Sequence, residues 1–188
     1  MRQTALSLEQ RFPSARKNSC LKTMNDAPSA FWDFSLRFYA KPGVPAACLE
    51  LQDRGGADVN VVLFLLYLAR RGRRISQADA AALDGAVAEW REQVVRPLRT
   101  ARRHLKTVGL PFAGEPAAQL RNDIKRHELA AERIQQLALE QQFPCATFGE
   151  AADSAIAAAS ANLEAYATHI GALPATAVSS LLQSFDQP

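Results

Sequence analysis

Aromatic and polar side chains that could line a small-molecule pocket occur in two neighbouring parts of the sequence. The candidates are Trp32, Asp33 and Tyr39 in the first part, and Asp53, Asp58 and Asn60 in the second. Carboxylates and an amide can orient a bound molecule, while aromatic rings supply apolar walls. A ligand pocket, in a binding protein or an enzyme, is therefore one hypothesis for the function.

The same residues also have structural explanations. Asp58 is a suitable N-cap for a helix, and Asn60 can satisfy amides at the start of that helix. Trp32 and Tyr39 can fill a hydrophobic core. The sequence alone leaves the pocket and the structural explanation open.

A second candidate surface is a group of basic residues on one side of a helix. Residues 70–106 contain ten basic residues and four acidic ones. At about 100° per residue, five basic side chains share one helix side. These five, which we call the basic ridge, are Arg96, Arg99, Arg102, Arg103 and Lys106. An anionic partner, either phosphate-rich or an acidic protein surface, could bind there.

Internal pairing is the alternative explanation for the basic ridge. Residues 116–170 carry seven acidic residues against four basic ones. If this acidic segment folds beside the basic helix, much of the positive charge is neutralised within the protein. No aromatic residue interleaves the ridge, so stacking of single-stranded bases is disfavoured and we expect no specific nucleic-acid partner.

The sequence contains no recognised motif for catalysis or metal binding. His104, His127 and His169 are far apart, and no H-E-x-x-H, G-x-S-x-G, P-loop or D-D-x-x-D motif occurs. We therefore expect no metal and no cofactor. We favour a protein that is not an enzyme, although the pocket hypothesis leaves an enzyme open.

Helix caps and breakers divide the chain into helices that would position these candidates. "SQAD" at 76–79 and "TFGE" at 147–150 resemble capping boxes, and Pro97 should kink or restart a helix. One expected helix, 116–142, has Leu120, Ile124, Leu129, Ile134 and Leu137 as its apolar positions. We expect no strand. The other expected helices span about 29–40, 44–54, 58–71, 76–96, 97–108, 147–170 and 175–185.

The stretch "DVNVVLFLLYLARRG", residues 58–72, is the most apolar part of the chain. Its uncharged run from Val61 to Ala69 is much shorter than the ~20 residues that span a bilayer, so we expect no membrane partner. A helix that is apolar nearly all round belongs at the centre of a bundle. The sequence therefore predicts an all-α, single-domain irregular bundle of six or seven helices around a central apolar helix at about 58–71.

The first 23 residues differ in character from the remainder. They carry five basic residues and one acidic residue, without the apolar run of a secretory signal. We expect residues 1–23 to be a disordered tail or a mis-assigned start before Met24, and 24–188 to be the helical domain. Three widely spaced cysteines favour a reducing cytoplasm.

Several short motifs between Phe31 and Gly72 carry a resemblance to a known family. They are W-D-F, Y-x-K-P-G-V, C-L-x-L-Q-D and G-x-D-V-N, followed later by the arginine-rich "VVRPLRTARRHLK". Over roughly 24–142 the chain resembles an uncharacterised, mostly proteobacterial family of small helical proteins. The resemblance implies a bacterial, cytoplasmic, all-helical protein and implies no activity, cofactor or catalytic residue.

Together these observations favour a non-enzymatic cytoplasmic helical adaptor or regulatory protein. Its protein partner, or a second copy in a homo-oligomer, would contact the basic 91–106 helix or an exposed apolar helix face. The alternative is a small-molecule binding protein or enzyme whose pocket lies near Trp32, Asp33, Asp53 and Asn60.

Overall fold

The computed structural model describes residues 28–187, so the expectation for residues 1–23 lies outside the described part. A five-residue π-helical segment, η2 (Arg91–Val95), joins α5 to α6 without a break. With α5, η2 and α6 taken as one rod, the described residues form seven helices, which confirms the all-α fold class. The helices are α2 (Ala30–Tyr39), α3 (Val44–Gly55), α4 (Val59–Arg70), α5 (Gln77–Trp90), α6 (Arg96–His104), α7 (Glu115–Gln142), α8 (Ala155–Ile170) and α9 (Ala175–Asp186).

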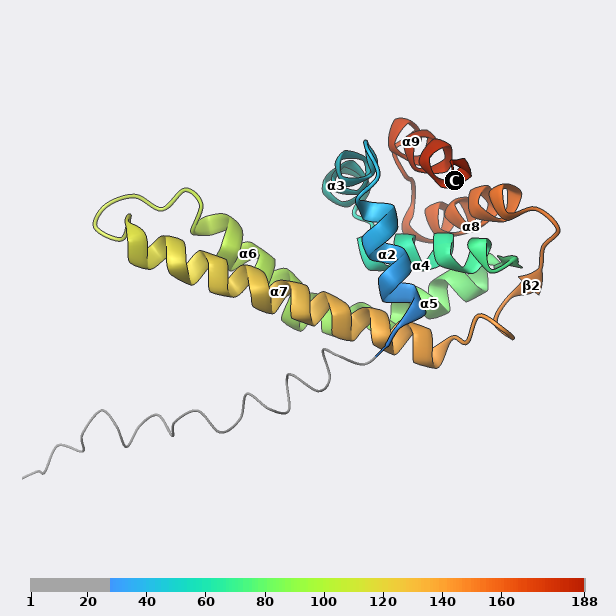
Figure 1. Ribbon diagram of the computed structural model, residues 1–188, viewed down its shortest axis with the longest axis horizontal. Helices are drawn as coiled ribbons and strands as arrows, with labels where there is room; N and C mark the ends of the chain where they lie inside the picture. The colour runs from blue at the N-terminus through green and yellow to red at the C-terminus, as the bar shows by residue number, and fades with distance from the viewer. Residues whose placement is uncertain (1–27, 188) are drawn as a thin grey trace, which may run out of the picture.

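Helix α4 lies at the centre of the helices (Figure 1). Every residue from Asn60 to Ala69 is buried, and α2, α3, α7 and α8 pack around them. The Asp58 carboxylate caps the helix by accepting hydrogen bonds from the amides of Asn60 and Val61. These findings confirm the predicted central apolar helix and its N-cap.

An aromatic cluster attaches α2 to this central helix. The ring of Phe31 meets that of Phe64 edge-on at 4.9 Å between centroids and lies 5.4 Å from that of Tyr67. Such edge and tilted contacts contribute about 1 kcal/mol each beyond the burial of apolar area. They orient α2 so that an adjacent side of this helix faces the pocket described below.

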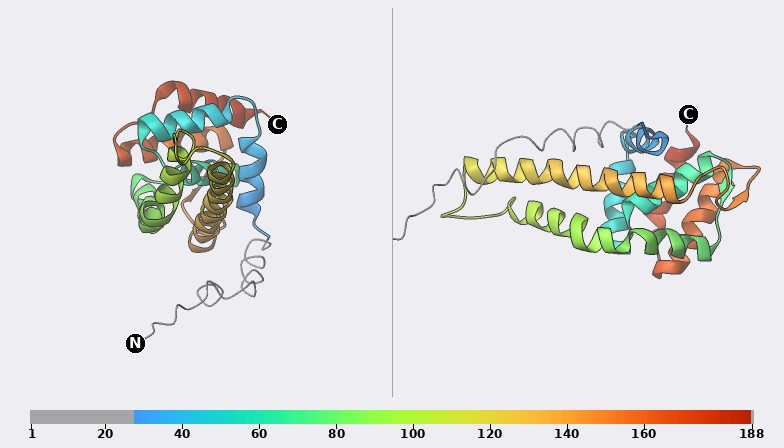
Figure 2. Two further views of the ribbon diagram at one scale, coloured as in Figure 1. Left: turned by 90° about the vertical axis from the view of Figure 1, so that its left-hand side faces the viewer. Right: turned by 90° about the horizontal axis from the view of Figure 1, so that it is seen from below.

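Helices α6 and α7 form an arm that extends away from the other helices (Figures 1 and 2). Pro97 lacks an amide hydrogen, and just before it the chain forms η2, in which the Arg96 amide donates to the Arg91 carbonyl five residues back. The regular α-helical hydrogen bonding is therefore replaced by a π-helical turn just before Pro97, while the rod itself continues. No residue of α6 is buried, and Leu110 and Phe112 at the end of the arm are 90% and 73% exposed.

Two expectations about the segment after α7 are wrong. The residues "TFGE" do not cap a helix, because Ser154 is the N-cap of α8 and its hydroxyl accepts from the Ala157 amide. Instead β2 (Glu150–Ala151) pairs antiparallel with β1 (Arg73–Arg74), where we expected no strand. The Arg73 guanidinium donates to the carbonyl oxygens of Phe148 and Gly149 and holds this segment extended.

Helix α7 buries a largely polar face. Two of its expected apolar positions, Leu120 and Leu129, are about half exposed. The residues that it buries are Glu128, Ala131, Gln135, Gln136 and Leu139. Because the polar side of α7 is buried, its amides and carboxylates lie against the centre of the protein, where they form part of the candidate site.

Candidate ligand-binding site

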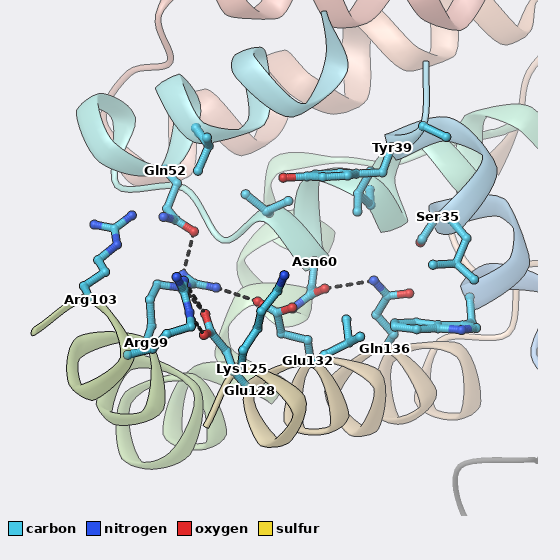
Figure 3. Close-up of a pocket in the computed structure, with 18 residues that line it drawn as sticks. Ser35, Tyr39, Gln52, Asn60, Arg99, Arg103, Lys125, Glu128, Glu132 and Gln136 are labelled. Carbon is cyan, nitrogen blue, oxygen red and sulfur yellow. Dashed lines mark hydrogen bonds and ion pairs between the residues drawn. The ribbon is translucent and has the colours of Figure 1, made fainter. Parts of the chain in front are cut away.

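A pocket of about 500 Å³ lies between α2, α3, α4, α6 and α7 (Figure 3). This volume falls within the range of small-molecule sites, about 300–1,000 Å³. Its polar walls include Ser35, Gln52, Asn60 and Gln136. The aromatic and large apolar wall residues are Trp32, Leu36, Tyr39, Leu49, Val59, Leu63 and Leu129, and the charged ones are Arg99, Arg102, Arg103, Lys125, Glu128 and Glu132.

A clip between α2 and α7 positions the α2 wall. The Ser29 hydroxyl accepts from the Trp32 amide and donates to the Glu140 carboxylate at 2.6 Å. The second oxygen of Glu140 accepts from the Phe31 amide at 3.0 Å. With the start of α2 held on α7, residues 32, 35, 36 and 39 share the helix side that lines the pocket.

A chain of amide hydrogen bonds, which we call the amide relay, connects α4 to α7. Gln135 Nε2 donates to Asp58 Oδ2 at 2.6 Å, and Asn60 Nδ2 donates to Gln135 Oε1 at 3.3 Å. Gln136 Nε2 in turn donates to Asn60 Oδ1 at 2.8 Å. Because the Asp58 carboxylate only accepts, it orients each amide in the relay. The relay therefore leaves the carbonyl oxygen of Gln136 as its free end.

Two buried polar atoms in the pocket wall have no hydrogen-bond partner among the described residues. They are Ser35 Oγ and Gln136 Oε1. Residue Ser35 is 4% exposed and residue Gln136 is 3% exposed. Figure 3 shows both residues at the same end of the pocket. Buried polar groups are hydrogen-bonded in the great majority of cases. These two atoms therefore offer unused bonding capacity where a ligand would lie.

A guanidinium–carboxylate cluster forms the opposite end of the pocket. Arg99 donates to Glu128 at 2.9 Å and to Glu132 at 2.6 Å, and Arg102 also binds Glu128. Burial alone would raise the pKa of Glu128, but the hydrogen bonds and charges of Arg102 and Arg99 outweigh it and leave this pKa below its usual value. Burial raises the pKa of Glu132, against the opposing effect of Arg99.

The basic ridge is consequently divided by the packing of α7. Arg99 and Arg102 face α7, which confirms internal pairing for these two residues. Arg103 pairs with Asp53 at 3.1 Å and Arg96 with Glu92 at 2.8 Å, both at exposed positions. Lys106 is exposed just beyond the end of α6. A helical wheel places these residues on one side but does not show which neighbouring helix covers that side.

The predicted pocket residues are distributed over two adjoining pockets. Trp32, Tyr39 and Asn60 line the pocket described above. Asp53, Asp58 and Asn60 line a second pocket of about 310 Å³. Asp33 is exposed and lines neither of them.

The structural roles expected for three of these positions are wrong. Tyr39 is 37% exposed and Trp32 is half-buried, so both border the pocket and do not fill the core. The Arg133 guanidinium lies over the Trp32 ring, with its central carbon 5.1 Å from the ring centroid. The Asn60 side chain bonds across to Gln135 and Gln136 and does not cap its own helix. The reason in each case is that α7 packs against α2 and α4.

Sequence reasoning missed the polar residues that α7 contributes. Lys125, Glu128, Glu132 and Gln136 recur every three or four residues and so share one helix side. This spacing predicts that the four side chains share one helix side, but a polar helix side ordinarily faces solvent and is not expected to line a pocket. Ser35 had no distinguishing signal beyond its place among the aromatic residues of α2.

The fold and the pocket define an all-α protein with a cavity between its helices. The model of the family described as "Protein of unknown function (DUF2390)" matches residues 30–139, and the chain belongs to this family. The match includes every residue that lines the pocket, from Trp32 on α2 to Gln136 on α7. No match was found among curated proteins or among solved structures.

Two features are absent from the part of the chain that the structure describes. No group of three or more histidine, cysteine, aspartate or glutamate side chains in residues 28–187 is arranged to hold a metal ion. None of the helices in this range is both long and apolar enough to cross a bilayer.

Proposed function

We propose that this protein binds a small organic molecule in the pocket between α2, α3, α4, α6 and α7. The observation that carries the proposal is the pair of buried, unpartnered atoms, Ser35 Oγ and Gln136 Oε1, in the wall of a cavity of about 500 Å³. A ligand group that bonds to both atoms would remove the cost of leaving them unsatisfied. The three widely spaced cysteines favour a reducing cytoplasm as the place of binding, and the family resemblance favours a bacterial one.

The composition of the walls supports a binding role. Aromatic and aliphatic side chains cover most of the pocket, and a few fixed polar groups provide direction. The amide relay and the Arg99 cluster hold these groups before a ligand arrives, which lowers the entropy cost of binding. The proposal assigns no reaction to the site.

A thermal-shift screen of metabolites against the full chain tests the proposal. A specific ligand should raise the melting temperature by roughly 5 °C when it exceeds its Kd about 100-fold. Ser35→Ala removes a hydroxyl that has no hydrogen-bond partner within residues 28–187, so it should weaken ligand binding about tenfold while leaving the fold intact.

Ser179→Ala is the matched control, because Ser179 is exposed on α9. Calorimetric titration of each hit should give the same affinity for this variant and the wild type. If no compound stabilises the protein, or if every hit binds Ser35→Ala as tightly as it binds the wild type, the proposal is wrong.

We also propose a second candidate function, an adaptor role for the end of the arm. Its support is the exposure of Leu110 and Phe112, at 90% and 73%, beside the basic residues His104 and Lys106. Exposed apolar residues with a charged surround are typical of protein interfaces. An acidic protein surface with an apolar recess would fit this end better than it would fit Arg99 and Arg102, which are already paired.

Affinity capture at low salt tests the adaptor role. A partner that binds the arm should be lost with Phe112→Ser and kept with Ile156→Ser, which alters an exposed apolar residue on α8. Light scattering of the purified chain separates a different partner from a second copy. Equal recovery with both variants would contradict a role for the arm.

A further inference from the structure

The pocket has two chemically different ends. Ser35 and Gln136 lie at one end, and Arg99 and Arg103 lie at the other (Figure 3). Lys125 extends from α7 toward the space between them (Figure 3). A ligand that fills the pocket therefore meets a neutral polar end and a basic end.

The neutral end requires a hydrogen-bond donor. The amide relay turns the Nε2 of Gln136 toward Asn60, so only the carbonyl oxygen Oε1 of Gln136 remains for a ligand. The two carboxylates that line the pocket, Glu128 and Glu132, already bind Arg99, and burying a cation without a counter-charge is costly. A neutral N–H or O–H group is the chemistry that fits.

The middle of the pocket favours a flat or apolar body. Trp32 lies one helical turn before Ser35, and Tyr39 lies one turn after it, so both rings border the same space. Burial raises the pKa of the Tyr39 hydroxyl, which stays neutral at physiological pH. Aromatic walls of this kind stack well on a planar ring.

The basic end favours an anion. Four basic and two acidic side chains line the pocket, and both acidic ones already bind Arg99 or Arg102. Lys125 has no ion-pair partner in the described range, and Arg103 has only an exposed one in Asp53. The positive charge left over is therefore available to a ligand.

Resting on the proposed function, we infer that the ligand is a small organic anion with a ring-containing apolar body. Its anionic group contacts Lys125 and Arg103, its ring lies beside Trp32 and Tyr39, and a neutral donor at its far end bonds to Gln136 Oε1. The Ser35 hydroxyl accepts from or donates to the same group.

Three probes that differ by one feature each test this class by calorimetric titration of the full chain. Indole-3-acetate carries the ring, the anion and the N–H donor. Naphthalene-1-acetate lacks the donor, and 3-methylindole lacks the anion. We expect indole-3-acetate to bind best, each missing group to weaken binding about tenfold, and added salt to weaken the two anionic probes only.

Substitutions of Lys125 and Gln136 test which residue contacts the anionic group of the ligand and which contacts its N–H donor. Lys125→Gln should weaken indole-3-acetate about tenfold and leave 3-methylindole unchanged, while Lys106→Gln, outside the pocket, should change neither. Gln136→Met should remove the preference for indole-3-acetate over naphthalene-1-acetate. Because that variant also breaks the bond to Asn60, Ser35→Ala serves as a second variant that breaks no internal hydrogen bond.

The outcomes separate this inference from the proposed function. If 3-methylindole or the cation tryptamine binds as tightly as indole-3-acetate, the ligand is not an anion, although the pocket still binds small molecules. If none of the probes binds and the metabolite screen yields a neutral or cationic ligand sensitive to Ser35→Ala, the inference fails and the proposed function stands. If the screen yields nothing, both fail.

Discussion

Glu128 and Glu132 lie one turn apart on α7, and both bind Arg99. Their surroundings nevertheless shift the pKa values of the two carboxyl groups in opposite directions. Glu128 also binds Arg102, and the two guanidinium groups lower its pKa although burial opposes them. Burial raises the pKa of Glu132, and the nearby charge of Glu128 adds to this effect. The ionised form is therefore favoured by folding at Glu128 and disfavoured at Glu132.

Substitution by glutamine should show these opposite signs. At pH 7.5 we expect Glu128→Gln to lower the free energy of unfolding by about 2 kcal/mol, because two charged hydrogen bonds weaken. Glu132→Gln should leave this free energy unchanged or raise it, because the substitution removes a charge that folding disfavours. Urea unfolding of both variants measures the difference.

The pH dependence follows from the same shifts. The pKa of Glu128 is lower in the folded chain, so its stabilisation is present above the unfolded value of about 4.3 and is lost as the pH falls through the folded value. The pKa of Glu132 is higher in the folded chain, so its cost is present at neutral pH and disappears as the pH falls toward 4.3. For both variants, the difference in free energy of unfolding from the wild type should therefore be smaller at pH 4 than at pH 7.5. Urea unfolding at the two pH values measures it. A loss of stability with Glu132→Gln as large as that with Glu128→Gln would contradict this account.

Arg91 connects carboxylates from several elements. Its guanidinium lies 2.6 Å from Asp84 and 3.3 Å from Asp58, and the side chains of all three are at most 15% exposed. Burial alone would lower the pKa of Arg91, but the hydrogen bond and charge of Asp84, with Asp58, raise it. Tyr166 of α8 completes the network by donating to Asp84 and accepting from the Asp58 amide.

Removal of the Arg91 charge should be strongly destabilising. We expect Arg91→Met to lower the free energy of unfolding by about 3 kcal/mol, because Asp58 and Asp84 are left buried without their cation. Arg74→Met is the control, because Arg74 pairs with Glu150 at an exposed site and should cost about 0.5 kcal/mol or less. Equal losses measured by urea unfolding would show that Arg91 acts as a surface residue.

Among the elements, the β1–β2 contact depends on a glycine. Gly149 has φ +70°, and a Cβ atom there would lie 2.5 Å from the Arg74 carbonyl oxygen. Gly56, at the end of α3, has a similar φ of +65° but no atom within 4 Å of such a Cβ. The two glycines therefore share the backbone requirement and differ in the space around them.

Alanine at these two positions separates strain from steric conflict. Gly56→Ala should cost about 1 kcal/mol, the penalty for a left-handed conformation with a side chain. Gly149→Ala should cost about 3 kcal/mol because the β1–β2 contact must also open. Thermal unfolding measures both, and equal shifts in melting temperature would contradict the role of the close approach.

At the scale of the whole molecule, the arm and the centre should differ in local stability. Helix α4 buries ten consecutive residues, whereas α6 buries none. Hydrogen exchange detected by mass spectrometry should show fast exchange in α6 and slow exchange in α4. Along α7, protection should rise from residues 116–126 to residues 128–139, where the buried positions begin. Uniform protection along α7 would contradict this gradient.

The helices and their ends were largely predictable because their signals are local. The Asp58 cap, the Ser76–Asp79 capping box and the apolar run in α4 each depend on residues within a few positions. The exception is the segment before α8, where a capping pattern was overridden by the contacts of Arg73 and Gly149 with a distant part of the chain.

The sequence by itself determined the all-α class and the central position of α4, because these depend on periodicity and capping. It also indicated an uncharacterised family. Only the tertiary structure decided that Ser35 and Gln136 share a pocket and that Arg99 and Arg102 are paired. The physical reason is that a polar helix side has no preferred neighbour of its own. Which helix covers the polar side of α7 depends on how the apolar sides of α2 and α4 pack. This packing made a pocket from residues that local patterns assign to solvent.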